Sequence, residues 1–162
     1  LSSTTSRSLV IQISVFTLAH TITLGLAATG VISPPSDIVE PLIALSIALV
    51  AIENLFFKKP PRWRPIVIFL FGLLHGLGFA GFFGELGLPE GQFWSALIGF
   101  NIGVEIGQLS VIILAIAVLS VWRWRNNIEY TDVVYRRFMI LPGSLLIGAT
   151  GSWWAMERVF LN

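Results

Sequence analysis

The chain has 162 residues, of which 55% are hydrophobic and only 12% charged, and its formal net charge is +1. Soluble domains average about 25% charged residues, so this composition indicates lipid as the solvent, and it offers no basic footprint for nucleic acid. Because cysteine is absent, disulfides, zinc-thiolate sites and iron-sulfur clusters are excluded, and any metal site must use nitrogen and oxygen ligands.

Five stretches are apolar over the roughly 20 residues that a helix needs to cross a bilayer. The first ends before Pro34 and Pro35, which cannot continue a helix, and the third starts with Pro65, a favourable first-turn residue. The fourth is longer than the hydrocarbon core requires and must tilt or protrude. We therefore predict an all-α polytopic transmembrane helix bundle, a single domain over residues 1–162, with helices at about 9–31, 38–57, 65–84, 93–122 and 138–161.

Positive charges follow the alternation of these helices. If the five spans alternate in direction, only Arg158 lies on one side, and all other basic residues lie on the opposite side: Arg7, Lys58, Lys59, Arg62, Arg64, Arg123, Arg125, Arg136 and Arg137. Cytoplasmic loops carry the excess of lysine and arginine. We therefore expect the N-terminus in the cytoplasm and the C-terminus outside.

Four ionisable residues lie inside the expected spans, where a charged group costs roughly 2.5 to 3.5 kcal/mol on insertion scales. His20 and His75 fall near the middle of the first and third helices, at similar bilayer depth. Glu53 comes late in the second helix, and Glu105 lies in the fourth. Because of that cost, we expect each of the four to have a polar partner, to line a cavity or to have a functional role.

Uncharged residues of two kinds accompany these four. Thr17 shares a helix face with His20, and Asn101 and Gln108 share one with Glu105, by their spacings of three, four and seven residues. Small residues spaced four apart let helices approach closely, and the chain has two such ridges for helix packing: Gly72 and Gly76 in the third helix, and Gly99, Gly103 and Gly107 in the fourth.

More than one chemistry fits this polar set. A lone intramembrane histidine or asparagine is often only an interhelical hydrogen-bond partner, but two histidines and two carboxylates over four helices exceed what packing requires. Neutral imidazole with carboxylate suits Ni, Zn, Co, Fe or Cu(II), and the same set would serve a proton relay. The sequence has no Gly-x-Ser-x-Gly element and no phosphate-binding glycine-rich loop ending in lysine, which disfavours nucleophilic catalysis and excludes nucleotide hydrolysis.

At these same residues the chain resembles the HupE/UreJ family of bacterial membrane proteins. Four stretches carry the resemblance, in the family's order: FTLAHTITL (16–24), ENL (53–55), FGLLHGLGFA (71–80) and FNIGVEIGQL (100–109). The resemblance implies a small multi-pass protein of the bacterial cytoplasmic (inner) membrane, associated with uptake of nickel or a related metal. It also implies that the family's polar motifs include His20, His75, Glu53, Asn101 and Glu105.

One departure from the family leaves two interpretations open. Relatives carry an upstream helix with a His-x-x-x-Gly-x-Asp-His pattern, which has no counterpart in this sequence, and the chain opens at Leu1 rather than Met. Either part of the presumed metal path is absent, or the chain is a fragment and Leu1 follows that helix.

The leading hypothesis is a divalent transition-metal permease or intramembrane metal-binding protein of the nickel or zinc class, rather than an enzyme. In this hypothesis His20 and His75 are metal ligands, Glu105 supplies an anionic ligand, and Glu53 lies toward the cytoplasmic exit. The surrounding polar residues orient or hydrate the ion: Asn101, Gln108, Thr17 and Asn54.

Two alternatives belong to other functional classes. One is an accessory structural subunit of a larger membrane complex, and the other is an intramembrane metal-dependent hydrolase with a metal-bound water activated by Glu105. The expected partners are the lipid bilayer, a metal ion, and other membrane subunits or further copies of the chain, but no nucleic acid.

Overall fold

The structure is a computed structural model that describes residues 3–79, 91–125 and 132–161. Within these ranges all regular secondary structure is helical: α1 (Ser3–Ala28), α2 (Ser36–Phe56), α3 (Arg64–Gly78), α5 (Phe93–Arg125), α6 (Asp132–Tyr135), the π-helix η1 (Arg136–Ile140) and α7 (Leu141–Phe160). Four stretches are long and apolar enough to cross a membrane, Ser8–Ala28, Ser36–Phe56, Phe93–Trp122 and Val133–Phe160, and α3 is a shorter apolar helix. The expected all-α transmembrane bundle is confirmed.

The last helical run starts earlier than the 138 expected from sequence. It begins at Asp132 and reaches Phe160 through the π-helical turn η1. Pro142 lies in the first turn of α7, where its ring has no N–H to donate and presses on the carbonyl four residues before it. The wider π turn just upstream lets the helix continue past this proline. The expected end of the third helix, 84, lies outside the described residues.

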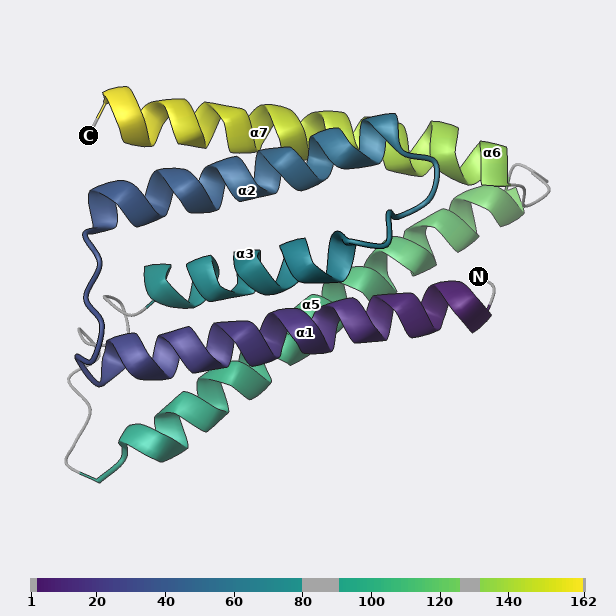
Figure 1. The fold of residues 1–162 in the computed structure, drawn as a ribbon. Coiled ribbons are helices and arrows are strands. Elements are labelled where there is room, and N and C mark those ends of the chain that lie inside the picture. Colours follow the sequence, from purple (N-terminus) through teal and green to yellow (C-terminus); the bar gives the residue numbers. More distant parts are fainter. Residues whose placement is uncertain (1–2, 80–90, 126–131, 162) are drawn as a thin grey trace.

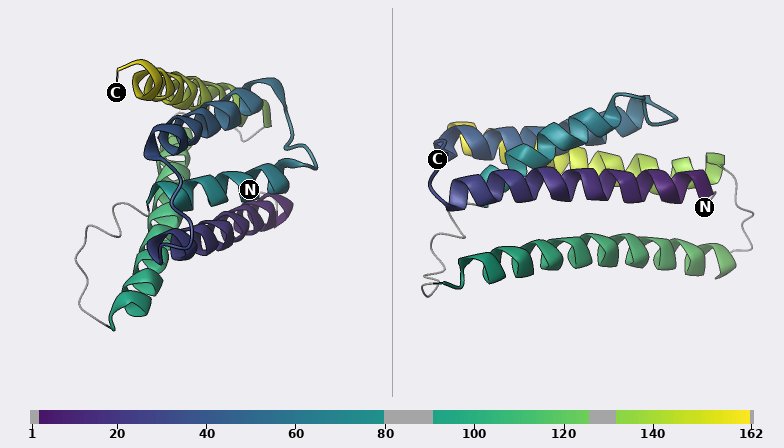
Figure 2. Two further views of the ribbon diagram at one scale, coloured as in Figure 1. Left: turned by 60° about the vertical axis from the view of Figure 1, so that its left-hand side comes forward. Right: turned by 60° about the horizontal axis from the view of Figure 1, so that its bottom comes forward.

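The helices form two closely packed pairs and one outlying member (Figure 1). α1 and α3 run parallel, α2 and α7 run antiparallel, and contacts between α2 and α3 join the two pairs. α5 crosses the others obliquely, packs chiefly against α1, and lies to one side of the bundle in both views of Figure 2. Its 33 residues correspond to about 50 Å of helix, which explains the tilt because the hydrocarbon core is about 30 Å thick.

Glycines set the close contact between α1 and α3. A Cβ at Gly72 would lie 2.6 Å from the Phe16 carbonyl oxygen, and one at Gly76 would overlap the Thr23 hydroxyl and the α1 backbone. The Thr23 hydroxyl also donates a hydrogen bond of 2.7 Å to the Leu73 carbonyl across the interface. Gly72 and Gly76 therefore hold the two backbones together, as small residues spaced four apart do in membranes.

Small residues also set a close contact between α2 and α7, at glycines that were not among those predicted to pack helices. A Cβ at Gly151 would lie 2.9 Å from the Ala48 amide nitrogen and 3.1 Å from the Ala44 carbonyl oxygen, and one at Gly148 would lie 3.3 Å from Ala51 Cβ. Small residues on both helices thus replace the interlocking large side chains of a soluble core.

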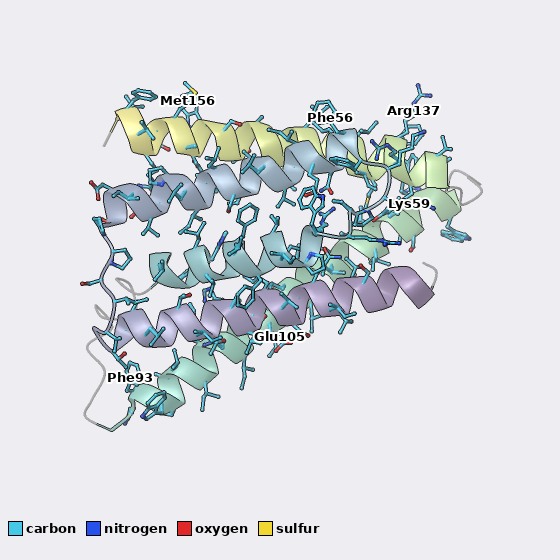
Figure 3. All side chains as sticks on the ribbon, viewed as in Figure 1. Phe56, Lys59, Phe93, Glu105, Arg137 and Met156 are labelled. Atoms are coloured by element: carbon cyan, nitrogen blue, oxygen red, sulfur yellow. The ribbon has the colours of Figure 1, made fainter. Side chains whose placement is uncertain are left out.

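The basic residues other than Arg158 gather at one end of the bundle. The amino end of α1, the α2–α3 connection, the carboxyl end of α5 and the amino end of α6 share this end (Figure 1). Figure 3 shows Lys59 and Arg137 there, and Phe93 and Met156 at the opposite end. The basic residues are thus distributed as expected for helices that alternate in direction. Which side of the membrane each end faces stays a prediction.

Candidate metal site

His20 lies at the centre of the α1–α3–α5 contact, enclosed by aromatic rings. Its ring is stacked between Phe16, with centroids 6.0 Å apart, and Phe100, with centroids 6.2 Å apart, and Phe79 meets it edge-on at 5.6 Å. We call Phe16, Phe79 and Phe100 the aromatic enclosure. His20 is only 1% exposed, and neither ring nitrogen has a hydrogen-bond partner among the described residues. A buried polar atom left unsatisfied in this way costs about 1 to 3 kcal/mol.

His75 also contacts Phe16. Its ring meets Phe16 edge-on, with ring centroids 5.2 Å apart. The distance between the two imidazole centroids therefore cannot exceed the sum of their distances from the Phe16 centroid, which are 6.0 Å for His20 and 5.2 Å for His75. His75 Nδ1 lies 2.8 Å from the Phe71 carbonyl oxygen. Because a carbonyl only accepts, Nδ1 carries the hydrogen, and Nε2 keeps its lone pair.

The two histidines share a depth in the bundle. Gly76, the residue after His75, packs on the backbone of α1 at His20 and Leu24. Since α1 and α3 run parallel, His75 lies within about one turn of His20 along the helix axis. The similar depth inferred from the two spans matches this packing.

A polar seam runs between α1 and α5. The Thr21 hydroxyl lies 2.6 Å from Asn101 Oδ1 and 2.7 Å from the Thr17 carbonyl oxygen, and its single hydrogen can serve only one of these acceptors at a time. Asn101 Nδ2 donates to the Leu97 carbonyl at 2.8 Å. Thr17 Oγ1 and Gln108 Oε1 are buried without a partner among the described residues. The seam thus keeps unused oxygen acceptors beside the aromatic enclosure.

Glu105 belongs to this seam by position. It is half-buried in the middle of α5 (Figure 3). α5 is antiparallel to α1, and Asn101 meets Thr21, so Glu105 lies at the level of Thr17, about one turn from His20 along the axis.

Glu53 lies elsewhere, in an ion pair between α2 and α3. Its carboxylate is 3.1 Å from the Arg64 guanidinium, with side-chain exposures of 7% and 15%. Arg64 also donates a hydrogen bond of 2.8 Å to Asn54 Oδ1. Arg64 is eleven residues before His75 on α3, or about 16 Å along the axis. The structure therefore does not bring Glu53 together with the histidines.

No three histidine, aspartate or glutamate side chains in the described ranges gather closely enough to hold a metal ion. Of the four ligands expected from sequence, His20 and His75 lie near one another, Glu105 lies about a turn away on α5, and Glu53 is apart. Gly99, Gly103 and Gly107 have no neighbour within 4 Å of the position of an added Cβ, so this ridge meets nothing in the described part of the chain.

A cavity of about 260 Å³ opens between α1, α2, α3 and α7, with His75 in its wall. The wall is apolar except for four residues: Ser46, Asn54, His75 and Ser144. Asn54 marks the end of the cavity nearest to Arg64.

Two arginines that the sequence places at the membrane surface have specific partners in the structure. Arg64 forms the ion pair described above, and Arg136 donates to the Leu55 and Phe57 carbonyls at 2.7 and 2.9 Å, which satisfies the open C-terminal end of α2. The position of Arg64 immediately before Pro65 was a signal for the first turn of a helix. Its partner on α2 has no local signal, because it depends on how two helices pack.

The comparisons with known proteins agree with these motifs. The profile of a family described as HupE / UreJ protein matches residues 1–158, nearly the whole chain. No curated protein and no solved structure gives a significant match. The matched span contains both histidines, the polar seam and the α2–α3 ion pair. The chain is a multi-helix integral membrane protein that belongs to the HupE/UreJ family.

Proposed function

We propose that this protein is a permease for a divalent transition-metal ion of the nickel class in a bacterial cytoplasmic membrane, and that His20 and His75 ligate the ion in transit. The observation that carries the proposal is the unpartnered imidazole of His20, which is 1% exposed with both nitrogens free of hydrogen bonds to described residues. The association of the family with nickel and cobalt transport supports a metal permease at the level of the family.

The donor chemistry supports this class of cargo. A neutral imidazole nitrogen is a ligand for Ni, Co and Zn, whereas Mg and Ca prefer oxygen alone. The Nε2 lone pair of His75 is left free by the bond from Nδ1 to Phe71. Glu105, at the level of the seam, supplies a negative charge that offsets part of the cost of bringing a cation into a low-dielectric interior.

The sparseness of the site also suits transport. A permeating ion must bind strongly enough to enter and weakly enough to leave. Two imidazoles with one carboxylate about a turn away make a weaker set than a closed structural site of four ligands. The aromatic enclosure keeps competing water away from His20.

The test is nickel binding and nickel uptake by a His20→Ala, His75→Ala double variant. We expect the purified wild-type protein to bind nickel and its expression to raise uptake of radioactive nickel, and both signals to fall at least tenfold in the double variant. Ser110→Ala is the matched control, because Ser110 is exposed on α5 and bonds only to the Ile106 carbonyl of its own helix. Equal binding and uptake in the double variant and the wild type would remove the proposal.

A second candidate function is an accessory subunit of a larger membrane assembly. It is favoured by Gly99, Gly103 and Gly107, whose face on α5 has no neighbour in the described part of the chain. Small residues spaced four apart on a lipid-facing helix are a surface for close association with another helix. If such an assembly exists, Gly103→Leu lowers the mass of the particle purified in mild detergent, and Ser110→Leu on the same helix leaves it unchanged.

A further inference from the structure

The cavity and the α2–α3 ion pair lie along one face of α3. Arg64, Ile68, Phe71 and His75 follow one another on α3 at spacings of four, three and four residues, which places them on one helix face. The last three line the cavity. Arg64 therefore stands on the same face, where the row of cavity-lining residues would continue toward the basic end of the bundle.

On α2 the row of cavity-lining residues ends at Asn54, which Arg64 binds. Ser46, Val50 and Asn54 line the cavity at intervals of four residues, and Asn54, the last of them, accepts the 2.8 Å hydrogen bond from Arg64. The neighbouring Glu53 carboxylate lies 3.1 Å from the same guanidinium nitrogen. Arg64 thus spans the space between α3 and α2 at the end of the cavity.

The ion pair is incompletely satisfied for its burial. Arg64 Nε is buried without a hydrogen-bond partner among the described residues, and Glu53 Oε1, although it lies 3.1 Å from Arg64 Nη1, makes an ion-pair contact and no hydrogen bond. Because a buried pair recovers its desolvation cost only when its remaining donors and acceptors are also bonded, the grip of Arg64 on α2 is weaker than its burial suggests.

Arg136 keeps the end of α2 fixed whether or not Arg64 is bound. Its two hydrogen bonds to the Leu55 and Phe57 carbonyls hold the last turn of the helix independently of Arg64. Departure of the Arg64 side chain therefore exposes Asn54 and Glu53 without unwinding the helix that carries them.

We propose that Arg64 is the gate at the basic end of this cavity. Held by Glu53 and Asn54, its guanidinium blocks passage between His75 and the α2–α3 end of the bundle, and its fixed positive charge repels a cation in the narrow low-dielectric space. When it releases α2, the carboxylate of Glu53 and the amide oxygen of Asn54 become available as oxygen ligands on the route. This inference rests on the proposed function only in taking the cargo to be a cation.

The absence of cysteine from the chain gives a direct test by thiol labelling. Ser46→Cys places one thiol in the cavity, because Ser46 is 2% exposed and lines it. Ser36→Cys is the matched control, because Ser36 is exposed at the start of α2, at the end of the bundle opposite Arg64 (Figure 1), where the protein meets water. In lipid nanodiscs both ends of the protein meet water while lipid covers its sides, so a small membrane-impermeant trimethylammonium thiol reagent reaches position 46 through an end of the bundle.

We expect the cationic reagent to label Ser46→Cys at least tenfold faster when Arg64 is replaced by Gln. The Glu53→Gln, Arg64→Gln double variant keeps similar volumes and leaves no unpaired buried charge, so it tests the gate if Arg64→Gln alone fails to fold. The ratio of the labelling rate with this reagent to that with a neutral reagent of similar size should also rise, because the guanidinium repels only the cation. In the Glu53→Gln, Arg64→Gln double variant, which uncovers no carboxylate, a packing role alone would leave this ratio unchanged.

Two outcomes decide between the proposals. Equal rates and equal ratios with and without Arg64 would overturn the gate, whatever the cargo. A tenfold increase in labelling together with no nickel binding or uptake by the wild-type protein would support the gate and remove the proposed function. Labelling of Ser36→Cys must not change with Arg64, and a parallel increase there would show an effect that does not depend on the cavity and would overturn the gate.

Discussion

Two buried polar regions, the aromatic enclosure of His20 and the α2–α3 ion pair, lie about 16 Å apart along the bundle and are built on opposite principles. Around His20 the walls are phenyl rings, and both imidazole nitrogens lack partners in the described ranges. Around Glu53 the chain supplies Arg64 itself. A buried polar group that is paired within the chain, such as Glu53, helps to hold two helices together. A buried polar group without a partner among the described residues, such as His20, is available to a ligand from outside the chain.

Breaking the ion pair from one side should give the largest change in stability. Arg64→Leu leaves the Glu53 carboxylate buried without its counter-charge, which costs about 3 to 5 kcal/mol. Glu53→Leu combined with Arg64→Leu should recover most of this loss, because no charge remains to be buried. Reversible unfolding in mixed detergent micelles measures both. An Arg64→Leu protein as stable as the wild type would show that the pair contributes nothing.

The two glycine ridges should respond oppositely to one methyl group. Gly76→Ala forces a Cβ into Thr23 and the α1 backbone, and overpacking of this kind costs about 1 to 3 kcal/mol. Gly103→Ala, the matched control, meets open space and should gain up to about 1 kcal/mol from the better helix propensity of alanine. The same unfolding assay checks both. Equal losses of stability at the two sites would contradict the finding that Gly76, and not Gly103, lies in a close helix contact.

His20 should behave as the reverse of Arg64. His20→Leu removes two unsatisfied buried nitrogens from the aromatic enclosure and should raise stability by about 1 kcal/mol, while nickel binding falls at least tenfold. Thermal unfolding in detergent and metal analysis of the same sample measure the two effects. If His20→Leu destabilised the protein as much as Arg64→Leu, His20 would have an internal partner and the contrast between the regions would disappear.

The seam between α1 and α5 should give the smallest effect. Thr21→Val removes the hydroxyl that meets Asn101 at 2.6 Å, and interhelical hydrogen bonds in membranes average about 0.6 kcal/mol. A double-mutant cycle of Thr21→Val with Asn101→Leu isolates the pair. A coupling near zero would mean that the hydroxyl bonds only to its own helix, at the Thr17 carbonyl.

Much of the architecture was predictable because it depends on local sums of hydrophobicity. The four long apolar helices, the shorter α3, the prolines near their ends and the basic end of the bundle all follow from composition in windows of about 20 residues. The common depth of His20 and His75 also followed, since position along a span determines depth. The π-helical turn before Pro142 did not follow, because the periodicity of the sequence says only that a helix continues.

The candidate site was less predictable, because ligands and partners are chosen between helices. Glu53 and Arg64 are eleven residues apart in sequence, on either side of a proline-containing connection, and the sequence assigned one to a metal path and the other to a membrane surface. Only the packing of α2 on α3 joins them.

The sequence alone determined the solvent, the helical class and the identity of the polar residues that lipid could not accommodate. The tertiary structure decided which of those residues have an ion-pair or hydrogen-bond partner among the described residues and which have none. The physical reason is range. The cost of placing a group in lipid is a property of that group and its own helix, whereas its partner depends on contacts between helices, such as the close contact that Gly72 and Gly76 allow between α1 and α3.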